Sequence, residues 1–344
     1  MAAVVSTSCA TASLTSGPGP DDLASAAGPL DAAVTQMATL EAAAPAAPAD
    51  VAIAPPPEAM EGETALRPPP AKLAARPQGT AAGTWAVIIG VDDYPGVKYD
   101  LRSAVNDAHD MDRALAGMGV PGENRLVLTD GQVTRGTIRN AVEWLTARAG
   151  PDAVAVFFFA GHVRKLSATT EAMIGADGRA VSDAELAASL RPLAARRAWV
   201  GIAACYGGGF TEVLAPGRVL TGAAPADEPA YENSEFSRSY MVEFMVRQAM
   251  IEGRAPETVQ SAFAYARDAL AQKYPNRQPV QFDHGGGALD LRQPGMPAPQ
   301  RKPSPAPQQP STRTTPTTAA PPKSGDDGGD DEKKCTGLGT LFGC

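Results

Sequence analysis

The sequence predicts an α/β domain in which helices cover both faces of a mostly parallel, six-stranded sheet. Short apolar runs alternate with segments of helical periodicity, and right-handed crossovers leave few other arrangements for this order. The clearest runs are too short for typical helices and apolar throughout, which is typical of strands buried on both faces. The predicted strands are Trp85–Val91, Arg125–Thr129, Val154–Ala160, Ala198–Cys205, Arg218–Ala224 and Gln278–Asp283.

Helices are predicted where apolar residues recur at helical spacing between these strands. Asp100 is placed to cap the first helix, and Gly119 ends it. The segment 163–179 is polar and contains glycine, so we predict a loop close to His162. Pro279 lacks a backbone N–H donor and predicts that the last strand lies at an edge of the sheet. The predicted helices are 101–118, 134–149, 183–194, 235–253 and 256–273.

Composition divides the 344 residues into three parts. Residues 84–292 have the length and apolar content of one ordinary domain. Residues 1–83 are rich in Ala and Pro, and residues 293–344 form a Pro- and Thr-rich, acidic tail with a terminal Cys pair. Both flanks offer too little apolar surface to offset the entropy of ordering, so we predict that they are disordered.

Charge and hydropathy exclude two classes of partner. The formal net charge is −8, and the sequence has no basic stripe, which argues against nucleic acid as a partner. It also lacks an apolar run long enough to cross a bilayer, so no transmembrane segment is predicted. The sequence leaves the oligomeric state open.

Three cysteines in the flanking segments, Cys9, Cys335 and Cys344, give information on the cellular location of the protein. Cys335 and Cys344 have a spacing that permits a disulfide, and Ala/Pro-rich spacers suit a domain held away from a surface. These features favour an extracytoplasmic, envelope-associated location, with a cytoplasmic location and free thiols as the alternative. The first residues lack the basic region of a signal peptide. A start site assigned too late would leave Cys9 as the remnant of a lipid-anchor position.

Two predicted strands end in residues with catalytic chemistry. One is followed by Gly161 and His162, and the other ends in Cys205. Because ligands and reacting groups gather outside the carboxyl ends of parallel strands, we expect both side chains at one edge of the sheet. A thiol and an imidazole can act there as nucleophile and base. Each residue also has a structural interpretation. Cys205 would then pack as a small buried hydrophobe, and His162 would be a hydrogen-bonded structural residue.

Four segments together resemble the caspase and metacaspase superfamily of cysteine peptidases. They occur in the order and spacing typical of that superfamily, and the resemblance covers residues 84–292. The chain looks like a bacterial member, which implies a caspase-like, three-layer α/β/α fold. The segments are Trp85–Gly90, Ala104–Ala108, Phe157–His162 and Ala203–Gly208.

The resemblance also implies a reaction. His162 and Cys205 stand where the family has its catalytic dyad, so the chain is expected to cleave peptide bonds through a thioester acyl-enzyme. The backbone N–H groups of Cys205 and Val163 would hold the oxyanion. Protein or peptide would be the substrate. No cofactor or metal is expected, and any calcium dependence is left open.

Two positions differ from the family pattern. Family members usually have glycine after the histidine, where this chain has Val163. Many metacaspases have an aspartate two residues before the nucleophile, in a pocket for Arg or Lys, and this chain has Ala203. We expect the lost charge to be replaced from a later loop, with solvated loop acids as the alternative. The candidate substrate-binding acids are Asp227, Glu228 and Glu232.

Three functions therefore remain open. The first and favoured one is an active caspase-like endopeptidase, with cleavage after basic residues. The second is a catalytically weak or inactive module that binds proteins, suggested by Val163 and Ala203. The third is another doubly wound enzyme or structural domain in which the histidine and the cysteine coincide by chance.

Overall fold

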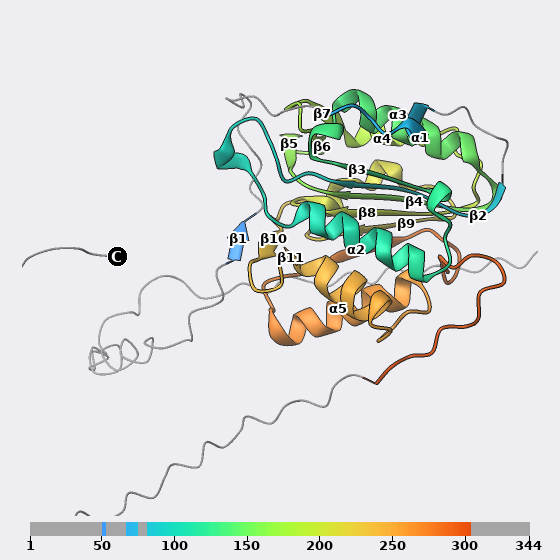
Figure 1. Cartoon of the computed structure of the whole chain (residues 1–344). Coiled ribbons are helices and arrows are strands. Elements are labelled where there is room, and N and C mark those ends of the chain that lie inside the picture. Colours follow the sequence, from blue (N-terminus) through green and yellow to red (C-terminus); the bar gives the residue numbers. More distant parts are fainter. Residues whose placement is uncertain (1–49, 53–66, 75–80, 304–344) are drawn as a thin grey trace, which may run out of the picture. The chain divides into compact units, whose positions relative to one another are not determined.

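The computed structural model describes residues 50–52, 67–74 and 81–303, and it contains the predicted six-stranded sheet (Figure 1). The strand order is β12-β9-β8-β4-β2-β3. All neighbours are parallel except β12, which runs antiparallel to β9 at the edge, as Pro279 predicts. The predicted fold class is confirmed. The strand bounds are β2 Ala81–Gly90, β3 Arg125–Thr129, β4 Ala149–Ala160, β8 Arg197–Ala203, β9 Arg218–Gly222 and β12 Val280–Asp283.

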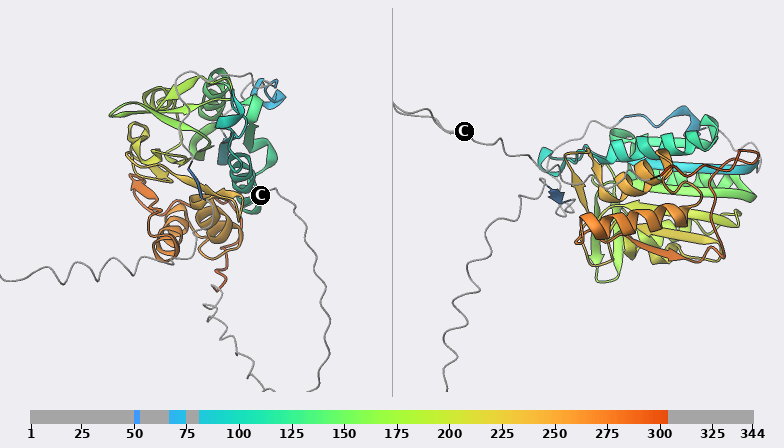
Figure 2. Two further views of the ribbon diagram at one scale, coloured as in Figure 1. Left: turned by 90° about the vertical axis from the view of Figure 1, so that its left-hand side faces the viewer. Right: turned by 90° about the horizontal axis from the view of Figure 1, so that it is seen from below.

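Helices lie on both faces of the sheet (Figure 1, Figure 2). One face carries α2 (Ala104–Gly117), the π-helix η6 (Val242–Ile251) and α5 (Val259–Lys273). The opposite face carries α3 (Arg135–Arg148) and α4 (Asp183–Ser189). The minor helices are α1 Ala71–Ala74 and the 3-10 turns η1 Val97–Tyr99, η2 Gly122–Asn124, η3 Asp130–Gln132, η4 Gly207–Gly209 and η5 Thr211–Val213.

The start of α2 differs from the prediction. The helix begins at Ala104, and Asp100 does not cap it. The carboxylate of Asp92 instead accepts hydrogen bonds from the N–H groups of Ala104 at 2.7 Å and Val105 at 3.2 Å. Asp100 accepts from the N–H of Tyr94 at 3.1 Å. A residue distant in sequence therefore satisfies the first donors of the helix.

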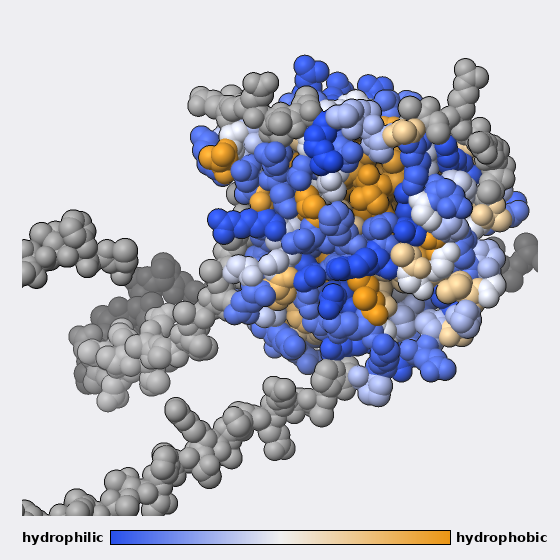
Figure 3. Space-filling view, in the orientation of Figure 1, coloured by the Kyte–Doolittle hydropathy of each residue, from blue (hydrophilic) through white to orange (hydrophobic). Residues whose placement is uncertain are grey.

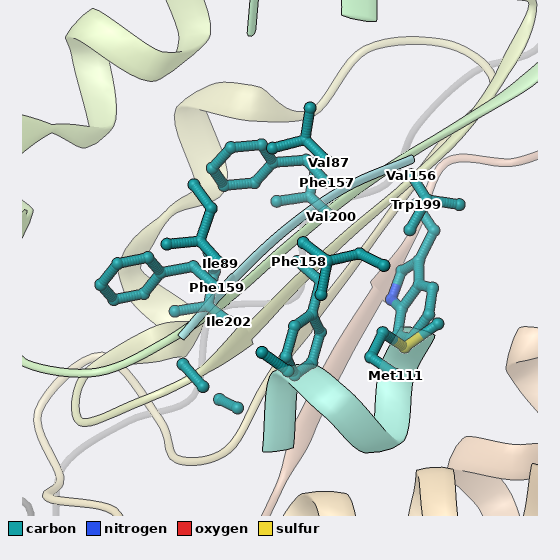
Figure 4. Close-up of a cluster of buried hydrophobic side chains, with 14 of the residues drawn as sticks. Val87, Ile89, Met111, Val156, Phe157, Phe158, Phe159, Trp199, Val200 and Ile202 are labelled. Atoms are coloured by element: carbon teal, nitrogen blue, oxygen red, sulfur yellow. The ribbon is translucent and has the colours of Figure 1, made fainter. Parts of the chain in front are cut away.

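The central strands are apolar throughout because both of their faces are buried. Successive side chains of a strand point to opposite faces. Phe157 and Phe159 lie on one face, whereas Phe158 lies on the other with Trp199 and with Met111 of α2 (Figure 4). The side chains lining the first face are Val87, Ile89, Val200 and Ile202.

Residues 163–179, predicted as a loop, instead form most of a small antiparallel sheet. The strands β5 (Val163–Ser167), β6 (Thr170–Ile174) and β7 (Ala180–Ser182) pair in that order. The prediction was wrong because β5 leaves the core after its first residue. Its exposed, polar positions carry no apolar periodicity.

A second small sheet joins segments that are far apart in the sequence. The strand β10 (Tyr231–Asn233) lies between β1 (Asp50–Ala52) and β11 (Arg238–Ser239), and both pairs are antiparallel. The start of the helix predicted at 235–253 is therefore a turn followed by the strand β11, and η6 begins after it. β1 and α1 are ordered elements within the N-terminal segment that composition predicts to be disordered.

The C-terminal end of the described chain is attached to the domain. The N–H of Gln293 donates to the carbonyl of Met118 at 3.0 Å, and that of Lys302 donates to Gly253 at 2.7 Å. Residues 293–302, which composition assigns to the tail, thus pack on the domain. Cys9, Cys335 and Cys344 lie outside the described residues.

Polar residues cover most of the face seen in Figure 3, and apolar residues appear between them in separate groups. Within the described part of the chain, no helix combines the length and the apolarity that crossing a bilayer requires.

Candidate active site

The two residues predicted as catalytic reach the same edge of the sheet. The adjacent parallel strands β4 and β8 pair Ala160 with Ala203. His162 and Cys205 each follow two residues beyond this pair. The two residues therefore follow adjacent strands at equal offsets, beyond the carboxyl ends of both strands.

The imidazole of His162 has a defined tautomer. Its Nε2 lies 2.7 Å from the carbonyl oxygen of Tyr99, which can only accept, so Nε2 carries the proton. Nδ1 is buried, and it has no hydrogen-bond partner among the described residues. Burial lowers the pKa of His162 to about 4. The ring is therefore neutral near pH 7, and Nδ1 is its basic atom.

A glycine allows the backbone before this ring to approach an aromatic side chain. Gly161 has φ of 152°, and a Cβ there would lie 2.6 Å from the hydroxyl oxygen of Tyr94. That oxygen accepts a hydrogen bond from the N–H of His162 at 2.8 Å. The Tyr94 ring also packs against the imidazole, with 4.6 Å between centroids. Any side chain at Gly161 would displace the histidine or the tyrosine.

The thiol of Cys205 lies against the start of β10. Its Sγ accepts a hydrogen bond from the N–H of Ala230 at 3.3 Å and lies 3.7 Å from the Ala230 carbonyl. Burial raises the pKa of Cys205 to about 11. The next residue, Tyr206, has φ of 56°, a left-handed conformation that turns the chain sharply after the strand. Cys205 is 0% exposed and His162 is 2% exposed, so both groups are shielded from solvent.

Val163 lies in β5 with its side chain fully buried in the core. The N–H of Ile174 donates to the carbonyl of His162 at 2.9 Å, which makes these two residues a hydrogen-bonded pair. Because such pairs alternate in an antiparallel ladder, the next pair, Val163 with Met173, is not hydrogen-bonded. The N–H of Val163 then points away from β6, and its side chain does not face a substrate.

The predicted substrate-binding acids occupy two different environments. Asp227 and Glu228 are exposed on a loop that the Tyr206 N–H holds through the Glu228 carbonyl at 3.0 Å. Glu232 is buried in β10, where its carboxylate accepts from the N–H of Arg102 at 3.1 Å and from the hydroxyl of Ser103. Ala203 is buried and supplies no charge.

Two further acids, neither of them predicted from the sequence, interact electrostatically with Glu232. Burial raises the pKa of half-buried Asp92 to about 6, and the charge of Glu232 adds to this shift. Burial also raises the pKa of Asp107, again with contributions from Asp92 and Glu232. Within the described ranges, none of the three has a salt bridge. We call Asp92, Asp107 and Glu232 the acid cluster.

A signal for the missed acids was present in the sequence. Asp92 directly follows the strand Trp85–Val91, at the edge where ligands are expected. Asp107 lies within Ala104–Ala108, one of the segments that carry the family resemblance.

Comparison with known proteins identifies the family. Residues 84–318 match the caspase domain of peptidase family C14, which is more than half of the chain. The chain belongs to this family of cysteine peptidases. Over 83 residues it is 34% identical to metacaspase-1 of Candida albicans. The matched stretch covers 22% of this chain and 18% of that protein. The chain thus matches less than a fifth of the length of that relative.

The caspase domain also has a similar solved structure. A protein from Geobacter sulfurreducens aligns with a TM-score of 0.47 and 16% identity, over 61% of this chain and 97% of that one. In the described part of the caspase domain, no group of three or more His, Cys, Asp or Glu side chains is arranged to hold a metal ion.

One ion pair ties the caspase domain together around the turn after Cys205. The ammonium of Lys165 lies 2.5 Å from the carboxylate of Glu171 and 2.8 Å from the Ala226 carbonyl oxygen. It also lies 5.5 Å from the Tyr206 ring centroid. Glu171 is 1% exposed, and a Cβ at Gly209 would lie 2.3 Å from its carboxyl carbon. Lys165 therefore links β5, β6, the 224–230 loop and the turn after Cys205.

Replacing Lys165 by methionine is expected to lower the free energy of unfolding by about 3 kcal/mol, because a buried carboxylate loses its cation. Adding Glu171→Gln should recover part of this loss, since the uncompensated charge is then removed. Urea unfolding at pH 7.5 measures both variants, with the exposed Lys273→Met as the control. Equal stability of Lys165→Met and Lys273→Met would contradict the assigned role of the pair.

The burial of His162 predicts a pH dependence of stability. Its folded pKa is about 4, below the ordinary value of about 6.5, so the unfolded chain binds the proton more readily between these values. Stability contributed by this site is therefore present above about pH 6.5 and is lost as the pH falls toward 4. Relative to His162→Gln, the wild type should lose about 2 kcal/mol of unfolding free energy between about pH 6.5 and 4.5. Parallel pH dependences of the two proteins would contradict the neutral, buried imidazole.

Proposed function

We propose that this chain is a cysteine endopeptidase in which Cys205 is the nucleophile and His162 moves the protons. The observation that carries the proposal is the orientation of the imidazole. Its Nε2–H donates to the Tyr99 carbonyl, which leaves the Nδ1 lone pair available as a base, and His162 follows the strand adjacent to β8, after which Cys205 stands. Nucleophile and base thus project from adjacent strands at matching offsets, as acyl transfer requires.

The reaction begins when the Cys205 thiol transfers its proton to Nδ1 of His162 and the sulfur attacks the scissile carbonyl carbon. The carbonyl π electrons move to oxygen, and the N–H groups of Val163 and Cys205 stabilise the oxyanion. The tetrahedral intermediate collapses, and the C–N bond breaks as the imidazolium protonates the leaving amine. Water, deprotonated by the same imidazole, then hydrolyses the thioester and restores the thiol.

Before substrate binds, the Cys205 thiol and the His162 imidazole are both neutral. A thiol with a pKa of about 11 and an imidazole with a pKa of about 4 do not form an ion pair before substrate binds. The proton transfer is then coupled to the attack on the carbonyl. Since both groups are buried, a substrate reaches them only after a covering segment moves.

The acid cluster supports a preference for a basic residue at the cleavage position. Burial raises the pKa of all three carboxyl groups, and none forms a salt bridge within the described ranges, so a positively charged ligand would stabilise their ionised forms. They lie at the start of α2 and on β10, and the residue before β10 contacts Cys205. Asp227 and Glu228 are exposed and contribute less, because water screens them.

An inactive binding module is the second candidate, and the burial of both catalytic groups favours it. Turnover of internally quenched peptides that contain Arg or Lys distinguishes the two functions. A peptidase releases product at a rate proportional to enzyme and loses this activity in Cys205→Ala. A binding module gives saturable fluorescence anisotropy with the same peptides and no product.

A further inference from the structure

The edge of β10 beside the thiol already holds a strand of this chain. β1 pairs antiparallel with β10, with Val51 opposite Glu232 and Ala52 opposite Tyr231 (Figure 1). We propose that Asp50–Ala52 is an internal occupant of the approach to Cys205, and that it restrains the peptidase until it is displaced. This inference rests on the proposed function, because it takes Cys205 as the reacting group.

The direction of β1 is the first argument. From Asp50 to Ala52 the strand advances along β10 from Asn233 to Tyr231. The next residue in that direction is Ala230, whose N–H and carbonyl both contact Sγ of Cys205. A polypeptide extended along this edge therefore runs toward the thiol. β1 occupies the hydrogen-bonding groups that an incoming peptide strand would need.

The sequence around β1 explains why Cys205 would not cleave this segment. Residues 1–66 contain no Lys or Arg, so this segment offers no cation to the acid cluster. β1 is followed by Ile53 and Ala54 and then by three consecutive prolines, Pro55–Pro57. A peptide bond to proline has no N–H and a fixed φ, which makes it a poor match for a strand-binding site. β1 thus has the direction of a substrate strand, and the residues that follow it in the sequence, up to position 66, lack a basic side chain.

The length of β1 makes the restraint reversible. Three residues pair with β10, and a strand this short is marginally stable by itself. The covalent tether compensates, since it gives the segment a high effective concentration at the edge. A peptide that pairs with β10 and also places an arginine in the acid cluster has an interaction that β1 lacks. The favoured occupant is therefore a basic peptide.

The test compares the full chain with Val51→Pro and with a chain that begins at Arg67. Proline at position 51 removes a backbone donor and disfavours strand pairing. Val34→Pro, in the same N-terminal segment but outside β1, is the matched control. Two readouts are recorded: kcat/KM on an Arg-containing fluorogenic peptide, and the rate at which iodoacetamide alkylates Cys205, measured by peptide mass mapping.

Val51→Pro and the shortened chain should raise both rates by about tenfold, the change expected if only about a tenth of wild-type molecules have β1 displaced. Val34→Pro should match the wild type. Faster alkylation without any peptide hydrolysis would support the occupant and count against the peptidase. If all variants hydrolyse the peptide and are alkylated at the wild-type rates, β1 does not restrain the site, but the proposed peptidase function stands. If no variant hydrolyses the peptide and the alkylation rate does not change, both the restraint by β1 and the peptidase function are contradicted.

Discussion

Replacing Cys205 by alanine or His162 by glutamine should lower kcat/KM on a basic peptide by at least about a thousandfold, as for other nucleophile and base pairs. Cys205→Ala removes the atom that forms the acyl-enzyme. His162→Gln keeps a polar side chain of similar reach but removes the basic Nδ1. Because the two groups act as one unit, the double variant should be no less active than either single variant.

The matched control for the histidine is His284→Gln, on an exposed loop after β12. Circular dichroism and urea unfolding establish that each variant is folded. Activity of His162→Gln within about tenfold of the wild type would exclude His162 as the base, since general acid–base catalysis contributes about a hundredfold or more. Loss of activity in His284→Gln would show that the assay reports the fold rather than the site.

Peptides with Arg at the cleavage position should be hydrolysed about a hundredfold better than matched peptides with Asp. Opposite charges about 4 Å apart contribute about 4 kcal/mol at an effective dielectric constant near 20, and desolvation of the arginine offsets part of this. Glu232→Gln should lower kcat/KM for the Arg peptide by about tenfold, because it keeps hydrogen-bonding groups at β10 but loses the charge. Steady-state kinetics on the two fluorogenic peptides measures both effects.

The control for the acid cluster is Asp227→Asn, which removes one negative charge from the exposed loop. It should change the Arg preference by less than about twofold, since exposed charges are screened. A larger effect at Asp227 than at Glu232 would move the specificity site to the loop. Preference for Asp peptides would reject basic specificity altogether.

The sheet was predictable because its strands are buried on both faces. The apolar runs at Val154–Ala160 and Ala198–Cys205 locate β4 and β8, and their ends locate His162 and Cys205. The small sheet of β1, β10 and β11 was missed for a different reason. β1, β10 and β11 have only two or three residues each, which is too short for any periodicity.

The partners of the site residues depended on tertiary structure. The Tyr99 carbonyl reaches His162 only because η1 returns over the sheet edge, and a backbone group has no sequence signature. The acid cluster forms because α2 packs beside β11, where the N–H of Ser239 donates to Asp107, and β11 pairs Ser239 with Glu232 of β10. The three acids predicted from the sequence lie within residues 227–232, whereas the acid cluster combines residues from the loop after β2, from α2 and from β10.

The most direct test of the Cys205 and His162 assignment is the mass of the intact protein after reaction with a peptidyl-arginine chloromethyl ketone. The full chain has three further cysteines, Cys9, Cys335 and Cys344, so the adduct must also be mapped by peptide sequencing. A nucleophilic Cys205 predicts one adduct, located at Cys205, lost in Cys205→Ala and slowed strongly in His162→Gln. An adduct on Cys335 or Cys344 alone, or equal labelling of the wild type and Cys205→Ala, would contradict the assignment.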